Sequence, residues 1–228
     1  MKLNKILRNI IIGGIFLLPF IPFIVAKSMF FPFITGKNFA FRIIIELILG
    51  GWLILAWRDV RYRLKFSWIL VALVVFLGVI TLADIFGENP LRSFWSNYER
   101  MEGLITLLHL FAYFAVAGSV LKGWRVWERF LQTSLGASVL ISIYSIFQLL
   151  GVFVINQGGV RIDATFGNAT YLAVYLLFHI FFAAFLFAQK GTSKILRFTY
   201  AGTTALLLFT LFNTATRGAV LGLTGGVF

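Results

Sequence analysis

The sequence has no cysteine and few charged residues, and both shortages exclude classes of function. Without cysteine, no disulfide, thiolate metal site or cysteine nucleophile is possible. The two histidines, His109 and His179, are too few for a zinc site, which usually takes four protein ligands. Charged residues make up 12% of the 228 residues, about half the usual share of a soluble domain. We therefore expect no metal site and too little polar surface for a water-soluble globule.

Long apolar runs take the place of the missing charge. Hydrophobic residues make up 60% of the chain, and the mean hydropathy is +0.94. A helix needs about 20 apolar residues to cross the hydrocarbon core of a bilayer, and it satisfies its own backbone there. The sequence therefore predicts one all-α polytopic transmembrane bundle. Its seven spans lie near residues 9–26, 39–57, 66–83, 103–121, 130–150, 170–189 and 198–213.

The two ends of the chain carry further expectations. The first run lacks a small-x-small cleavage site, so we expect a retained helix with a kink at Pro19 and Pro22. An eighth span begins near Arg217, but the 11 residues that follow it are too few to cross a bilayer. We therefore expect a C-terminally truncated, N-terminal part of a longer protein.

Basic residues alternate between rich and poor loops. The N-terminus and the loops after the second, fourth and sixth spans carry 13 of the 20 lysines and arginines, whereas the opposite side carries six. The positive-inside rule predicts a cytoplasmic N-terminus in a bacterial inner membrane. Topology and contact with anionic membrane lipids explain the net charge of +12, so a nucleic-acid partner is not needed.

Polar features gather in the predicted outer loops. In the loop after the third span, Asn89 and Pro90 suit the start of a short helix at the membrane surface. Arg92 and Glu99 are interpreted as solvated charges, whereas substrate contact is a more plausible role for Arg100. The apolar face of this helix consists of Leu91, Phe94, Trp95 and Tyr98, at spacings of three and four residues.

The other two outer features each contain one arginine. The glycine-rich loop 151–169 contains Arg161, for which a local ion pair with Asp163 and ligand binding are equally open. A glycosylation sequon begins at Asn168, but a motif this short recurs by chance and is discounted. Arg217 stands between two apolar runs with polar neighbours, which favours anion binding over snorkelling to the interface.

Two charged residues and two histidines lie within the predicted spans. Arg42 and Glu46 are four residues apart and are expected to form a buried structural pair. His109 and His179 have no acidic neighbour in sequence, so packing between helices is the favoured role for both.

Three short windows together resemble the O-antigen ligase and O-antigen polymerase superfamily. They are SFWSNYERMEG at residues 93–103, Arg161 with TFGN at 165–168, and TRG at 216–218. The span pattern resembles this superfamily over nearly the whole chain. The chain has Asn-Ala-Thr from Asn168, where the family often has Asn-Pro-Asn.

The resemblance implies a membrane glycosyltransferase of the C-type architecture, active in lipopolysaccharide or cell-surface polysaccharide biosynthesis. Such an enzyme transfers a glycan from undecaprenyl pyrophosphate to an acceptor at the outer face and needs no metal or other cofactor. Arg217 is the first candidate for pyrophosphate binding and Arg161 the second, with Arg100, Asn168 and Asp163 as secondary candidates. The proposed catalytic histidine of the family lies in a large loop further along, so no catalytic residue is assigned and this part alone is expected to be inactive.

Ligase and polymerase activity are not distinguished, and neither the sugar nor the acceptor is identified. One alternative is a polysaccharide transporter or flippase without covalent chemistry, in which Arg42, Glu46 and the histidines line a path. Transporters usually contain internal repeats, and none is readable here. A non-enzymatic assembly protein is the second alternative, although it would not require polar, glycine-rich outer loops.

Overall fold

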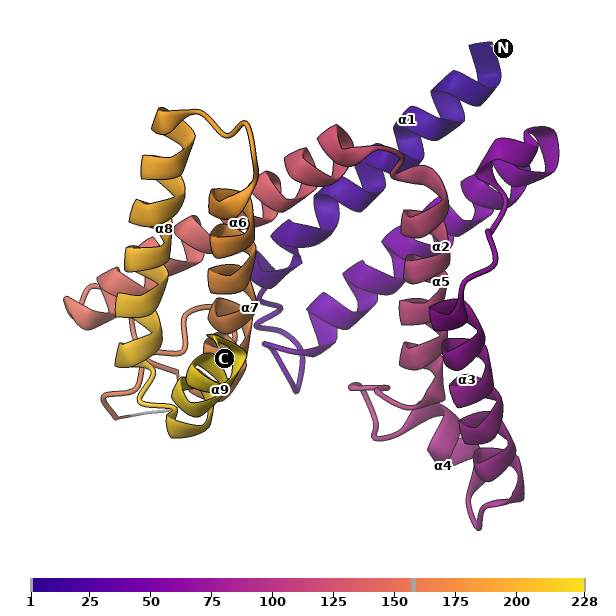
Figure 1. Cartoon of the computed structure of the whole chain (residues 1–228). Helices are drawn as coiled ribbons and strands as arrows, with labels where there is room; N and C mark the ends of the chain where they lie inside the picture. The colour runs from indigo at the N-terminus through magenta and orange to yellow at the C-terminus, as the bar shows by residue number, and fades with distance from the viewer. Residues whose placement is uncertain (1, 157–158, 228) are drawn as a thin grey trace. The chain divides into compact units, whose positions relative to one another are not determined.

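The computed structural model describes residues 2–156 and 159–227, and these residues form helices and connecting loops without any strand (Figure 1). The all-helical prediction is therefore confirmed for the described part of the chain. The contacts divide the protein into two compact units, Met1–Val126 and Trp127–Phe228. The α-helices are α1 (Lys2–Leu17), α2 (Thr35–Arg58), α3 (Trp68–Phe86), α4 (Pro90–Trp95), α5 (Leu104–Val120), α6 (Trp124–Leu149), α7 (Ala169–Ala188), α8 (Lys194–Asn213) and α9 (Arg217–Val227).

Six of the seven predicted spans correspond to helices that are long and apolar enough to cross a membrane, which indicates a multi-pass membrane protein. The seventh, predicted near 103–121, corresponds to α5, which is apolar but only 17 residues long. The count of seven therefore stays a prediction. Several helices, α1, α2, α6 and α8 among them, begin earlier than the apolar runs do, because helical structure continues into polar residues. For example, α8 begins at Lys194, where the side chain of Ser193 accepts a hydrogen bond from the Leu196 N–H at 3.3 Å.

The prolines of the first span interrupt the α-helix as predicted. Helix α1 ends at Leu17, and a 3₁₀ segment, η1 (Leu18–Phe23), follows with Pro19 and Pro22 in it. Proline has no backbone N–H and clashes with the preceding turn, so the regular α-helical bonding cannot continue.

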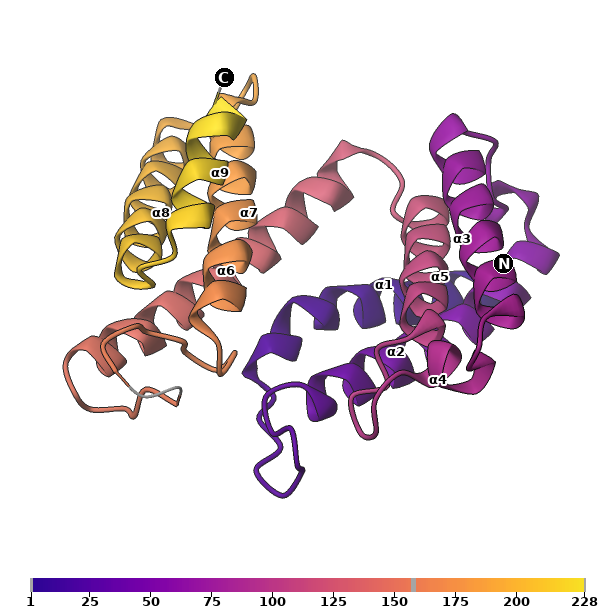
Figure 2. The same cartoon turned by 90° about the horizontal axis from the view of Figure 1, so that it is seen from below.

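The core of the first unit lies between α1 and α2, which run side by side, and α5 packs on α2. Ile11 and Ile15 of α1 and Ile45 and Leu55 of α2 are fully buried there. Helices α3, α4 and α5 contact one another, as Figure 2 also shows. None of the residues of α3 is buried by the rest of the protein.

The core of the second unit lies between α7 and α8, with α9 packed against both (Figure 2). Leu172 and Leu176 of α7 and Leu207 of α8 are fully buried. His179 of α7 is 6% exposed and lies 2.8 Å from the hydroxyl of Ser134 in α6. Its ring also contacts Tyr175, at 4.0 Å between ring centroids. The surroundings of His179 are therefore those of a residue packed between helices, as expected.

The predicted surface helix is shorter than its apolar stripe. Helix α4 ends at Trp95, because Ser96 has a φ of 63° in the left-handed region and the chain turns there. The expectation that Tyr98 shares the helical face with Leu91 is therefore wrong. Pro90 does occupy the start of the helix, as predicted.

Candidate functional site

The two arginine-bearing loops of the second unit meet in the structure. Arg161 donates from Nε to the carbonyl oxygen of Thr214 at 2.9 Å and from Nη2 to the hydroxyl of Thr216 at 3.0 Å. These acceptors lie 53 and 55 residues further along, in the turn between α8 and α9. Arg217 is the next residue after Thr216, so the chain brings both predicted pyrophosphate ligands to one place. We call Arg161, Thr214, Thr216 and Arg217 the arginine site.

The local ion pair between Arg161 and Asp163, one of the two roles left open for Arg161, is not found among the described residues. Asp163 is fully buried, whereas Arg161 is exposed and turns to the α8–α9 turn. The Asp163 carboxylate accepts hydrogen bonds from Gln148 Nε2 at 2.8 Å and from the backbone N–H of Asn156 at 3.0 Å. A buried carboxylate must be matched by donors, and the end of α6 supplies one through Gln148. Asp163 is therefore placed to hold the loop and not to contact a ligand.

The side chain of Gln148, near the end of α6, holds the loop that carries Arg161. Its side chain is 3% exposed, and its carbonyl oxygen accepts from the backbone N–H of Ala164 at 2.8 Å. The same amide donates to Asp163 and to the Val154 carbonyl oxygen, at 2.8 Å each. Loop residues on both sides of Arg161 are thus tied to one helix end, which limits the motion of the arginine between them. Gln148 was not among the predicted site residues, although a glutamine at the end of an apolar run is a signal of a polar contact.

Arg217 is exposed like Arg161 but differs from it in making no hydrogen bond or ion pair within the described parts of the chain. It is the first residue of α9, and unpaired backbone N–H groups at a helix start favour anions. The residues before it are ordered, since Thr214 is fully buried and its hydroxyl donates to the Leu211 carbonyl oxygen at 2.7 Å. The site therefore combines one clamped guanidinium with one that is free to bind.

Both loops of the site contain an alanine with left-handed backbone geometry. Ala164 has a φ of 46° and Ala215 a φ of 50°, a region that a residue with a Cβ rarely adopts. Such strain is often found where a loop is held in a functional geometry. Asn168 has a different role, because its side chain caps α7 by accepting from the Thr170 N–H at 2.8 Å.

The third predicted feature, residues 93–103, lies in the first unit and is docked on the start of α2. Glu99 accepts from the Phe31 N–H at 3.2 Å, and the carbonyl oxygen of Arg100 accepts from Asn38 Nδ2 at 3.0 Å. The Arg100 guanidinium stacks 4.2 Å from the centre of the Phe31 ring. These contacts give Arg100 a packing role, and they explain the polar pattern of the segment.

The expected pair of Arg42 and Glu46 is also absent. Arg42 is 6% exposed and donates to the Met101 carbonyl oxygen and to the Thr106 hydroxyl, the latter at 2.8 Å. Glu46 lies instead 3.2 Å from the imidazole of His109 on α5. Spacing along one helix predicted the pair, but the approach of α5 offers each side chain a different partner.

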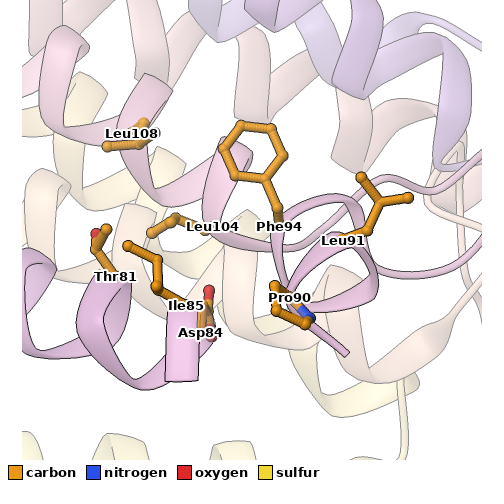
Figure 3. A pocket seen from close by; sticks show the side chains of 8 residues that line it. All are labelled: Thr81, Asp84, Ile85, Pro90, Leu91, Phe94, Leu104 and Leu108. Atoms are coloured by element: carbon orange, nitrogen blue, oxygen red, sulfur yellow. The ribbon is translucent and has the colours of Figure 1, made fainter. Parts of the chain in front are cut away.

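An apolar pocket of about 460 Å³ opens beside this segment (Figure 3). Helix α3 contributes Thr81, Asp84 and Ile85, while Phe94 of α4 and Leu104 of α5 face the same space. Asp84 is the one ionisable side chain among the lining residues, which otherwise suit a hydrocarbon chain. Within the described residues, no group of histidines and carboxylates suits a metal ion.

Comparison with known proteins yields no relative. The sequence matches no protein-family model and no curated protein, and the structure matches no solved structure.

Proposed function

We propose that this chain binds the lipid-linked donor of a membrane glycosyltransferase reaction and resembles the O-antigen ligases. In this proposal, the enzyme transfers a glycan from undecaprenyl pyrophosphate to an acceptor at the outer face of the bacterial inner membrane. The single observation that carries the proposal is the clamp of Arg161 on the turn that precedes Arg217.

The chemistry of the arginine site supports a pyrophosphate ligand. A guanidinium is planar, stays charged at any physiological pH and matches two phosphate oxygens at once. Arg161 has five N–H donors, and its Nε and Nη2 hold the turn, so Nη1 is left for a ligand. Arg217 adds a second charge, and the start of α9 adds backbone N–H groups. Two such charges would also stabilise the diphosphate as it leaves the sugar.

A clamped arginine suits this role better than a mobile one. The hydrogen bonds from Arg161 to Thr214 and Thr216 fix its orientation before the ligand arrives, so less side-chain entropy is lost on binding. The buried Asp163 and Gln148 extend this support to the loop itself. We assign donor binding to the described residues, and the proton transfers of the reaction to none of them.

Binding of undecaprenyl pyrophosphate to the purified chain in nanodiscs tests the proposal. We expect Arg217→Ala and Arg161→Ala each to weaken binding about tenfold or more, since each removes charge-assisted hydrogen bonds to phosphate. Undecaprenol, which lacks the diphosphate, should bind all variants alike.

Arg197→Ala is the matched control, because Arg197 is exposed in the same unit but lies in the first turn of α8. Its affinity should equal that of the unchanged chain. Equal binding by all three variants would remove the arginine site from the proposal.

The transporter alternative has less structural support. It depends on charged groups that line a path within the spans, and Arg42 is its main candidate. Arg42 instead ties α2 to the segment before α5 through two acceptors. A side chain engaged in this way braces the bundle, and it would have to break both bonds to meet a passing substrate.

A further inference from the structure

We propose that a basic pocket at the start of α1 binds the phosphate headgroup of an anionic phospholipid. The pocket has a volume of about 350 Å³ and is separate from the arginine site, so this inference does not depend on the proposed function. Helix α1 lines it with Lys2, Lys5 and Arg8. The 3₁₀ segment η2 (Val60–Tyr62) and the residue before it contribute Asp59, Arg61 and Tyr62.

The charge of the pocket favours a phosphate. Four cations and one carboxylate line it, which leaves an excess of three positive charges. Asp59 is already engaged, because Arg61 donates to it at 2.8 Å, and these hydrogen bonds lower the pKa of the Asp59 carboxyl. Lys2, Lys5 and Arg8 are then free of any carboxylate among the described residues, and an anionic ligand can supply their counterion.

The pocket is built and not merely a cluster of surface lysines. Arg58 Nε donates to Asn4 Oδ1 at 3.0 Å, which ties the end of α2 to the start of α1. Trp52 Nε1 donates to the Tyr62 carbonyl oxygen at 2.9 Å, and the ammonium of Lys122 lies 4.4 Å from the Tyr62 ring centre. These bonds set the position of the wall formed by η2. Both walls of the pocket are therefore held by contacts within the protein.

One donor in the pocket is buried without a partner. The Nε of Arg8 is inaccessible to solvent and makes no hydrogen bond within the described residues, although Nη2 of the same side chain reaches Asn9 at 3.2 Å. A ligand oxygen cannot reach this nitrogen, so the part of Arg8 that can contact a phosphate is the exposed end of its guanidinium.

The position of the pocket indicates that the phosphate belongs to a lipid. It lies where α1 begins and just after α2 ends, at the polar ends of two helices that are long and apolar enough to span a membrane. Headgroup phosphates occupy this level in a bilayer, and basic pockets between membrane helices commonly hold them. The loop charges predict this end to be cytoplasmic, where anionic lipids meet the protein.

Native mass spectrometry of the full chain in neutral detergent, with trace phosphatidylglycerol or phosphatidylcholine added, tests the proposal. Detergent removes the surface potential of a bilayer, so only a formed site retains the lipid. We expect at least tenfold preference for phosphatidylglycerol. Lys5→Gln/Arg8→Gln should reduce the affinity for this lipid about 25-fold, or about fivefold for each cation removed.

A second variant and a matched control keep the result unambiguous. Lys2→Gln/Lys5→Gln alters two exposed side chains, leaves the fold intact and should also weaken binding about 25-fold. Lys194→Gln/Arg197→Gln removes the same two residue types at the same spacing in the first turn of α8, and it should retain unchanged affinity.

Equal losses in the control and pocket variants would overturn the proposal, because they would show diffuse attraction. Absence of lipid preference in the unchanged chain would overturn it as well. Displacement of the lipid by inorganic phosphate at equal concentration would identify a soluble phosphate compound as the ligand and refute the lipid source.

Discussion

Asp163→Ala should release the loop that carries Arg161. The substitution removes the carboxylate that accepts from Gln148 Nε2 at 2.8 Å and from the backbone and side-chain N–H groups of Asn156 at 3.0 and 3.2 Å. Hydrogen bonds to a charged group contribute about 1.5–3 kcal/mol when buried, and those from the exposed Asn156 contribute less. We therefore expect the loop to lose about 3 kcal/mol of local stability.

Hydrogen–deuterium exchange measures this loss of local stability at individual amides of the loop that carries Arg161. A change of about 3 kcal/mol raises the open fraction of the loop on the order of a hundredfold. The amides of Ala164 and Phe166 report it, because they donate to Gln148 Oε1 at 2.8 Å and to the Asp163 carbonyl oxygen at 3.0 Å. Amides in the middle of α7 and α8 should exchange as before, since their bonds are internal to the helices.

Asp163→Ala also tests whether the position of the loop affects the proposed donor binding. With the loop open, Arg161 no longer starts from its clamped position, so binding of undecaprenyl pyrophosphate should weaken although no ligand contact is removed. Glu88→Ala is the control, because Glu88 is an exposed acid in the first unit. Unchanged exchange at Ala164 and Phe166 in the Asp163 variant would refute the reasoning that the buried carboxylate holds this loop.

Two further predictions concern the segment docked on α2. Gly103→Ala places a Cβ on the backbone oxygen of Ser93, so thermal unfolding in detergent should show a loss of about 1–3 kcal/mol. Gly118→Ala, in open space on α5, should be neutral or slightly stabilising. Arg42→Met removes the bonds to Met101 and Thr106 and should cost about 2 kcal/mol in the same assay. Both bonds come from Nη2, and a lysine ammonium ends one bond closer to the backbone, so Arg42→Lys should not restore the loss in full, and full restoration would contradict this account.

The helices were predictable because their cause is local and repeated. Twenty apolar residues in a row indicate a span whatever the rest of the chain does, and a proline interrupts its own turn. Helix ends were less predictable, since α6 begins at Trp124, well before the apolar run expected near residue 130. Polar residues such as Glu128 and Arg129 were excluded from the span but continue the helix.

The partners of the polar side chains were not predictable, because distant segments decide them. Sequence proximity made Asp163 one candidate partner for Arg161, yet Arg161 donates to acceptors more than 50 residues away. The carboxylate of Asp163 accepts from Gln148, whose position in the sequence indicated only that it belongs to a span. The composition of the loops identified Arg161 and Asp163 as candidate site residues. Only the tertiary contacts show that Arg161 is exposed whereas Asp163 is buried.

Helix α3 illustrates how a membrane relaxes the demands on a sequence. None of its residues is buried by the protein, so most of its side chains need only be apolar enough for contact with lipid chains. They do not have to fit the shape of a neighbouring helix. Evolution can exchange one aliphatic residue for another along the outer surface of such a helix with little cost. The few residues that line the pocket beside α4 are the exception, and selection on this helix is expected to concentrate there.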